Sequence, residues 1–257
     1  MLLAIDIGNS NTVLGLYRGE KLEHCWRLQT DRGRTGDEWA LAIRGLFDLA
    51  GVALRTVDGV IIACVVPPVL TAIDGFCRKH LGCVPLVAGV ELDCGMPVRC
   101  DSPREVGADR IVNAVAAYHR RRRSVIVVDF GTATTFDVVS SQGEFLGGAI
   151  APGLGISAEA LYQRASKLPR VEIAPPPQAV ARNTVHSMQS GLFFGYVGLV
   201  DGIVGRMILE LGDTPLVLAT GGLAGLIGPH SQTIDEVDPD LTLDGLRIIF
   251  ERNKSAS

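Results

Sequence analysis

An internal repeat restricts the possible folds of this chain more than any other feature of its sequence. Residues 2–12 read LLAIDIGNSNT and residues 125–135 read VIVVDFGTATT. Each copy is an apolar run, then an aspartate, one apolar residue, a glycine and small polar residues. Residues 13–28 and 136–150 follow with two strands joined by a glycine-containing turn. We therefore predict an α/β protein of two similar domains, residues 1–118 and 119–257, with a cleft between them.

The first predicted meander leads into a helix over residues 35–51. Thr35 and Glu38 have the spacing of a capping box, and Gly51 is placed to end the helix. A second strand follows over residues 57–66, and its counterpart is residues 214–222. The apolar side chains of the helix fall on one face: Trp39, Ile43, Leu46, Phe47 and Ala50.

A proline-rich loop and a long helix follow in the second half. Residues 167–183 are typical of a lid or binding loop, and residues 184–211 predict a helix. Its glycines share one face, which lets another helix approach closely, either from the same chain or from a second copy. Polar residues interrupt this helix, so we do not expect it to span a membrane. The glycines are Gly191, Gly195, Gly198, Gly202 and Gly205.

Composition and charge exclude several functional classes. The net charge is −4, whereas a nucleic-acid-binding domain is usually basic on one face. The basic run at residues 120–123 suits the solvated end of a helix. No basic segment precedes the first apolar run, and none of the six cysteines forms a CxxC pair. We expect a cytoplasmic protein with reduced cysteines that binds neither nucleic acid nor membrane.

The repeated turn has the chemistry of an anion site. Gly8 permits a tight turn and close backbone approach, and the polar residues after it can hold phosphate oxygens. One copy alone would indicate an ordinary hairpin. Two copies resemble the actin, sugar-kinase and heat-shock ATPase superfamily, which implies actin-like (ribonuclease H-like) domains. A P-loop pattern is absent from the sequence.

Further stretches resemble the type III pantothenate kinases in a single register from the first residue to about Arg247. Residues 6–12 read DIGNSNT, residues 104–110 read REVGADR and residues 129–135 read DFGTATT. Residues 147–155 read GGAIAPGLG and residues 238–246 read DPDLTLDGL. The resemblance implies a homodimeric enzyme that uses ATP to phosphorylate the primary hydroxyl of pantothenate, the first step towards coenzyme A.

The resemblance also implies roles for individual residues. Asp109 is the implied proton acceptor, and Asp129 the ligand of a monovalent cation, K⁺ or NH₄⁺. Asp6 suits Mg²⁺, which usually takes one or two carboxylates besides phosphates and waters. The implied pantothenate-binding residues are Gly107, Ala108, Asp109, Arg110 and Thr184. The implied ATP-binding residues are Asp6, Ile7, Gly8, Asn9, Ser10, Asn11, Thr12, Val13 and Thr132.

Alternatives remain for several of these residues. Asp109 could simply complement a helix dipole, and Thr184 could cap its helix. Arg110 could clamp a carboxylate with its planar fork or lie on the surface. Gly221 and Gly222 either support an adenosine or form a plain turn. Cys100 stands where the family usually has a tyrosine.

Two other functions compete with a pantothenate kinase. One is a kinase of the same superfamily that acts on a sugar or another carboxylate. The other is a non-catalytic accessory or regulatory protein that retains the nucleotide-binding fold. The presence of Asp6, Asp109 and Asp129 argues against the loss of catalysis.

Overall fold

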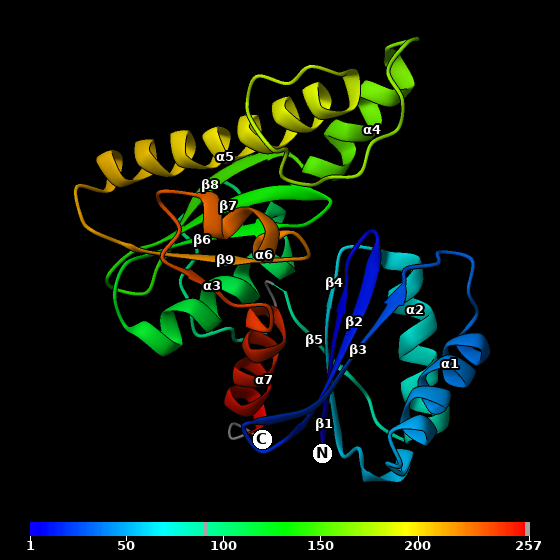
Figure 1. The fold of residues 1–257 in the computed structure, drawn as a ribbon. Helices are drawn as coiled ribbons and strands as arrows, with labels where there is room; N and C mark the ends of the chain where they lie inside the picture. The colour runs from blue at the N-terminus through cyan, green and yellow to red at the C-terminus, as the bar shows by residue number, and fades with distance from the viewer. Residues whose placement is uncertain (90–91, 255–257) are drawn as a thin grey trace. The chain divides into compact units, whose positions relative to one another are not determined.

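Two five-stranded mixed sheets form the framework of the chain in a computed structural model, which describes residues 1–89 and 92–254 (Figure 1). Unit 1 comprises Met1–Met96, Asp101–Ala116 and the last helix, α7 (Leu241–Lys254). Unit 2 comprises Pro97–Cys100 and Ala117–Asp240. The expected division between residues 118 and 119 falls inside helix α3 (Ala108–Arg121), which passes from one unit to the other.

The sheet of unit 1 has the strand order β3-β2-β1-β4-β5. Strands β1, β2 and β3 form an antiparallel meander, and β4 and β5 add to it in parallel. The central strand is apolar because it is buried on both faces. The strands are β1 (Leu2–Ile7), β2 (Asn11–Arg18), β3 (Lys21–Gln29), β4 (Gly59–Cys64) and β5 (Leu86–Val87).

Unit 2 repeats this topology, with the order β8-β7-β6-β9-β10 from the matching end. Strand β6 corresponds to β1, and β9 pairs with it in parallel as β4 pairs with β1. The predicted duplication, the two meanders and the α/β class are confirmed. The strands are β6 (Val125–Phe130), β7 (Ala133–Val139), β8 (Phe145–Pro152), β9 (Leu216–Thr220) and β10 (Glu236–Val237).

Helices α1 (Gly36–Leu49) and α2 (Pro67–Phe76) pack on one face of the first sheet. The predicted capping box is confirmed, because Glu38 N donates to Thr35 Oγ1 and Thr35 N donates to Glu38 Oε2 (3.3 and 2.7 Å). Alternate side chains of β1 belong to this core. Short helical turns occupy Leu54–Thr56, Cys77–Leu81, Pro103–Glu105 and Gly228–His230.

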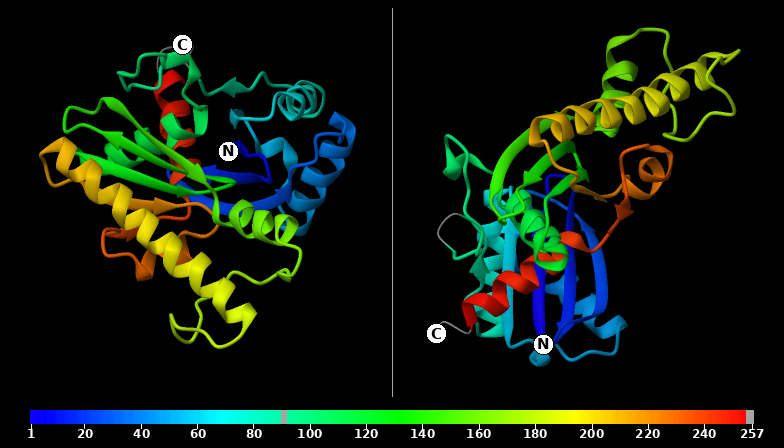
Figure 2. Two further views of the ribbon diagram at one scale, coloured as in Figure 1. Left: turned by 90° about the horizontal axis from the view of Figure 1, so that it is seen from above. Right: turned by 90° about the vertical axis from the view of Figure 1, so that its left-hand side faces the viewer.

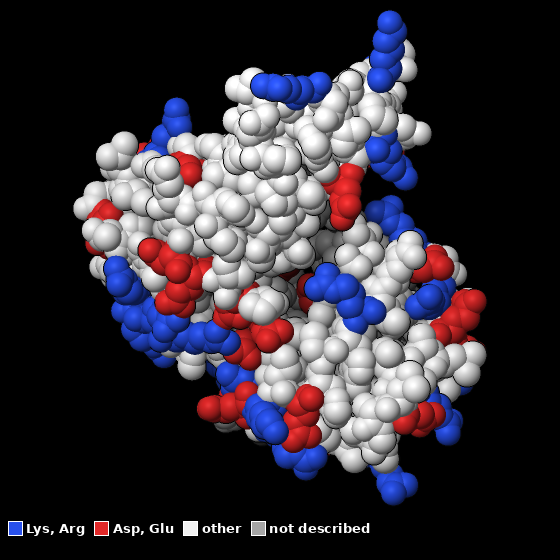
Figure 3. All heavy atoms as spheres, in the orientation of Figure 1, with Lys and Arg blue, Asp and Glu red and all other residues white. Residues whose placement is uncertain are grey.

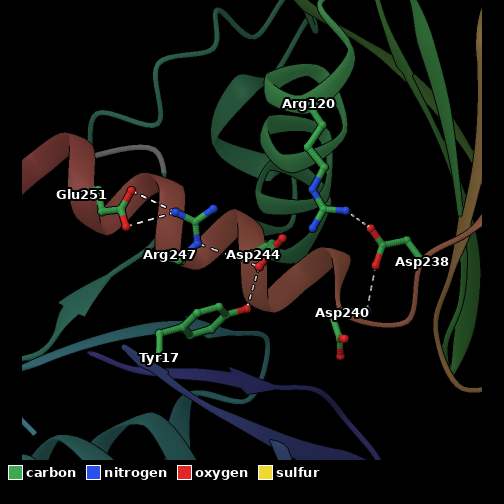
Figure 4. A network of polar contacts seen from close by, with 7 residues as sticks. All are labelled: Tyr17, Arg120, Asp238, Asp240, Asp244, Arg247 and Glu251. Carbon is green, nitrogen blue, oxygen red and sulfur yellow. Dashed lines mark hydrogen bonds and ion pairs between the residues drawn. The ribbon is translucent and has the colours of Figure 1, made fainter. Parts of the chain in front are cut away.

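Helix α7 packs against the other face of β1, although it follows all of unit 2 in the chain. Tyr17 on β2 donates to Asp244 on α7 (2.8 Å; Figure 4). Thr242 donates to the buried Asn113 of α3 (2.7 Å). The two helices approach so closely at Gly245 that a Cβ atom there would overlap the Val112 carbonyl oxygen.

In unit 2, helix α5 (Thr184–Leu211) lies across one face of the second sheet, as Figure 2 shows. The predicted long helix is confirmed, and the proline-rich segment before it contains neither helix nor strand. Among the described residues, α5 alone has the length and apolar composition to cross a membrane, a test that core helices also pass. Two shorter helices are α4 (Leu154–Arg164) and α6 (Ala224–Ile227).

We had expected the basic run at the end of α3 to be solvated, but its side chains also contact other parts of the protein. Arg120 pairs with Asp238 (Figure 4), and Arg121 pairs with Glu236, which ties the end of the helix to the β10 segment of unit 2. Lys and Arg are interspersed with Asp and Glu over the face that Figure 3 presents. The other two arginines also contact the fold, because Arg123 donates to Thr214 O (2.6 Å) and the Arg122 guanidinium lies over the Tyr118 ring.

The contact between α7 and α3 predicts the effect of a small substitution. Gly245→Ala should destabilise the protein by about 1–3 kcal/mol, because the methyl group overpacks a buried backbone contact. Gly45→Ala on α1 is the matched control, since no atom lies within 4 Å of its added Cβ, and it should stabilise by about 0.5–1 kcal/mol. Urea denaturation measures both, and an unfolding midpoint for Gly245→Ala at or above that of the wild type would contradict the prediction.

Candidate functional site

The first repeated turn closes directly after β1. Gly8 N donates to Asn11 O (3.0 Å), and Asn9, Ser10 and Asn11 are exposed. Asp6, one residue before the end of β1, is half-buried. The strand alternation puts its side chain on the face opposite the α1–α2 core. The turn thus presents backbone and small polar groups beside one carboxylate.

The second repeated turn follows β6 and is one residue shorter, because Phe130 pairs with Thr134 whereas Ile7 pairs with Thr12. Gly131 N donates to Ala133 O (3.1 Å), and Gly131 and Thr132 are exposed. Asp129 is half-buried and pairs with residues of β7 and β9, as Asp6 pairs with residues of β2 and β4. The two predicted aspartates therefore occupy equivalent positions, each within its own unit.

Close contacts with glycines shape the second turn. A Cβ atom at Gly221, where φ is +91°, would overlap the Asp129 Oδ1 atom. A Cβ atom at Gly153 would overlap the Thr132 carbonyl oxygen, which accepts from Gly153 N (3.1 Å). Sequence reasoning missed Gly153 as a contact of the turn, although it lies in the GGAIAPGLG stretch. For Gly221 the sequence suggested adenosine support or a plain turn, and not a contact with Asp129.

Thr30 braces the first turn and was not predicted from the sequence. Its Oγ1 donates to Gly8 O (2.7 Å) and lies 2.9 Å from Thr12 Oγ1, and its N donates to Ser10 O (3.0 Å). Arg32 Nη2 then donates to Asn9 Oδ1 (3.2 Å). A residue at the end of β3 thus fixes three positions of the turn, which local spacing could not reveal.

The Gly107–Arg110 segment starts helix α3 in unit 1. Gly107 O accepts from the N–H groups of Arg110 and Ile111 (3.2 and 3.3 Å), and Asp109 Oδ1 accepts from Arg110 N (2.9 Å). Burial raises the pKa of Asp109, and this outweighs the lowering by Arg110. An acid that only complements a helix dipole would be stabilised in its charged form. Burial therefore outweighs any such stabilisation at Asp109.

The remaining predicted residues lie in unit 2. Asn183, not Thr184, caps α5, because its Oδ1 accepts from His186 N (2.9 Å). The suggestion that Thr184 caps the helix was therefore wrong; Thr184 is its first residue and is exposed. Cys100 lies beside β8, where its sulfur would be 3.6 Å from a Cβ atom at Gly147.

A metal site built entirely from protein side chains is not supported by the described residues. The parts of the chain that the structure describes contain no group of three or more His, Cys, Asp or Glu side chains able to hold an ion. This fits Mg²⁺, which is commonly bound by one or two carboxylates together with substrate phosphates.

The sequence is similar to known proteins over nearly its whole length. A family model described as type III pantothenate kinase matches residues 2–206. A protein of Syntrophotalea carbinolica named type III pantothenate kinase is 61% identical over 254 residues, 99% of this chain and 100% of that protein.

Two solved structures are similar in fold alone. One, from Campylobacter jejuni and assigned to a Baf family of transcriptional activators, is 17% identical with a TM-score of 0.60, over 98% of this chain and 99% of that one. The other is MreB 5 of Spiroplasma citri bound to AMPPNP, 10% identical with a TM-score of 0.57, over 99% and 97%. These likenesses agree with the expected actin-like fold.

Proposed function

The chain belongs to the type III pantothenate kinase family, and on this premise we propose that it transfers the γ-phosphoryl group of ATP to the primary hydroxyl of pantothenate. The products are 4'-phosphopantothenate and ADP, and the reaction is the first step towards coenzyme A. The observation that carries the proposal is the match along nearly the entire chain to a relative of that name. We also propose that the protein works in the cytoplasm.

In this proposal the two repeated turns bind the phosphates of ATP. The Asp6–Val13 stretch and Thr132 supply backbone N–H groups and hydroxyls, which suit phosphate oxygens. Phosphoryl transfer depends mostly on positioning and electrostatic stabilisation. Gly153 allows close approach to the second turn, and its N–H donates to the Thr132 carbonyl oxygen, which supports this role.

Asp109 is the proposed general base. The alcohol oxygen of pantothenate attacks the γ-phosphorus atom as the bond from phosphorus to the ADP oxygen breaks, and Asp109 accepts the hydroxyl proton. Its raised pKa supports this role, because it makes the carboxylate a better base than an exposed aspartate. Arg110 and Thr184 are proposed to bind pantothenate, with the guanidinium clamping the carboxylate at its far end.

Two cations complete the proposed site. Mg²⁺ would be held by the phosphates with Asp6, and a monovalent cation, K⁺ or NH₄⁺, by Asp129. When bound, these ions offset the negative charge of ATP and of the two carboxylates. The glycine at position 221 leaves room for the Asp129 carboxylate, because a Cβ atom there would overlap Asp129 Oδ1.

An assay of ADP release, with and without pantothenate, tests the proposed function. Release that depends on pantothenate supports it, and release that depends instead on a sugar or another carboxylate would point to a different kinase. No release with any of these acceptors would leave the accessory role, which is the function in the name of the Campylobacter jejuni structure.

Replacement of the proposed base should impair chemistry without unfolding the protein. Asp109→Asn should lower kcat about 10²–10⁴-fold while ATP still binds. The folded state holds the Asp109 proton more tightly than the unfolded chain, so ionisation at neutral pH opposes folding. The variant should consequently be at least as stable as the wild type at pH 7.

Asp48→Asn is the control for this prediction, because Asp48 is an exposed carboxylate on α1. It should leave kcat unchanged. In the wild type the rate should fall at acidic pH as Asp109 becomes protonated, beginning at a higher pH than for an ordinary aspartate. Near-normal kcat in Asp109→Asn would exclude Asp109 as the base, and Asp6 would be the next candidate.

The proposed monovalent site predicts a cation requirement. Activity should fall sharply when K⁺ and NH₄⁺ are replaced by Na⁺ alone or by a bulky organic cation, because the Asp129 carboxylate then lies near the phosphates without the proposed ion. Steady-state rates at constant ionic strength measure this. Full activity without K⁺ and NH₄⁺ would remove the role from Asp129.

We also propose a homodimer that forms through the glycine face of α5. No atom lies within 4 Å of a Cβ added at Gly191, Gly195, Gly198 or Gly205, so no described part of the same chain packs there. Light scattering at micromolar concentration should give twice the 27.3 kDa chain mass. Gly198→Gln should shift the protein towards monomer and Gly45→Gln on α1 should not; a wild-type monomer would refute the proposal.

A further inference from the structure

The loop after β3 is fastened to the first repeated turn at one end and to α1 at the other. Thr30 contacts Gly8, Ser10 and Thr12 of the turn, as described above. At the other end, the Arg34 guanidinium lies over the buried Trp39 ring, 4.8 Å from its centroid. Asp31 Oδ1 accepts from Gly33 N (2.9 Å), which closes the loop between these anchors. The loop is therefore held in a fixed position beside the turn.

Arg32 lies in the middle of this loop and extends to the turn. Its Nη2 donates to Asn9 Oδ1 (3.2 Å), and its side chain is otherwise exposed. Within residues 1–89 and 92–254, no carboxylate lies within ion-pair distance of Arg32. A guanidinium has five donors, and this contact uses one of them. Arg32 thus brings an uncompensated positive charge to the turn that we propose for phosphate binding.

We infer that Arg32 is a phosphate-binding residue that contacts the γ-phosphoryl group of ATP. This inference rests on the proposed function. Unit 1 also carries the Gly107–Arg110 segment, which is proposed to bind the acceptor, whereas the adenosine contact expected at Gly221 and Gly222 belongs to unit 2. The phosphoryl group that meets the acceptor is the transferred one. We therefore expect a cation of the unit that carries the acceptor segment to meet the transferred group.

The physical effect of Arg32 would be to neutralise charge that spreads over the oxygens of the transferred group. A planar guanidinium binds two phosphate oxygens at once, which an ammonium group does not. The loop anchors hold the guanidinium near the turn before ATP binds. Thr30, which contacts the turn and not the ligand, acts here as a positioning residue.

Calorimetric binding of nucleotides to the full chain with Mg²⁺ tests the inference without pantothenate. Arg32→Ala should weaken binding of the non-hydrolysable ATP analogue AMPPNP about 10- to 100-fold, as expected for the loss of hydrogen bonds to a charged group. Binding of ADP should be nearly unchanged, because it lacks the γ-phosphate. Arg32→Lys should give an intermediate loss. Arg55→Ala is the control: Arg55 is exposed beside Thr56, which accepts from the Met1 ammonium group at the opposite end of β1.

Steady-state kinetics give the second readout. Arg32→Ala should lower kcat about 10²-fold and raise KM for ATP, with KM for pantothenate unchanged. Equal losses for AMPPNP and ADP, no loss for either, or a change confined to KM for pantothenate would overturn the inference. So would a wild-type chain that binds no AMPPNP. If the wild type binds AMPPNP but releases no ADP with pantothenate, the proposed function fails while the binding comparison still decides the role of Arg32.

Discussion

Each unit is built around one strand that is buried on both faces and paired on both edges. Strands β1 and β6 have an antiparallel neighbour on one side and a parallel neighbour on the other. Such a strand cannot carry an uncompensated charge along its length, because burial of an unpaired charge is costly. The first position where a carboxylate is tolerated is the carboxyl end, where Asp6 and Asp129 are half-buried. The carboxylate of each central strand consequently lies beside the turn that follows it.

In unit 1 the segment that we propose to bind pantothenate depends on a helix from the far end of the sequence. Helix α3 begins with the Gly107–Arg110 segment, and its buried Asn113 is held by Thr242 of α7. The absence of a side chain at Gly245 sets the separation of the two helices. The position of Asp109 relative to the sheet of unit 1 thus depends on α3, which carries it, and on α7, which packs against both α3 and β1.

The sequence predicted the features that arise from local patterns. The repeat predicted both meanders, Thr35 and Glu38 predicted the cap of α1, and residues 184–211 predicted α5 to its exact bounds. Features that depend on contacts between distant segments were missed. Thr30 is twenty-two residues from Gly8, and nothing near it in the sequence marks it as a brace. Asn183 was overlooked as a cap because the threonine beside it is also a common capping residue.

The contribution of α7 to unit 1 has a consequence for how the protein is made. During synthesis, chains emerge at about 5–20 residues per second, so α7 leaves the ribosome roughly ten seconds or more after β1. In that interval the face of β1 that α7 will cover has apolar side chains such as Leu2 without their partner. Unit 2 by contrast is complete as soon as Asp240 has emerged. The amino-terminal unit is therefore the last to close, which reverses the usual order of folding on the ribosome.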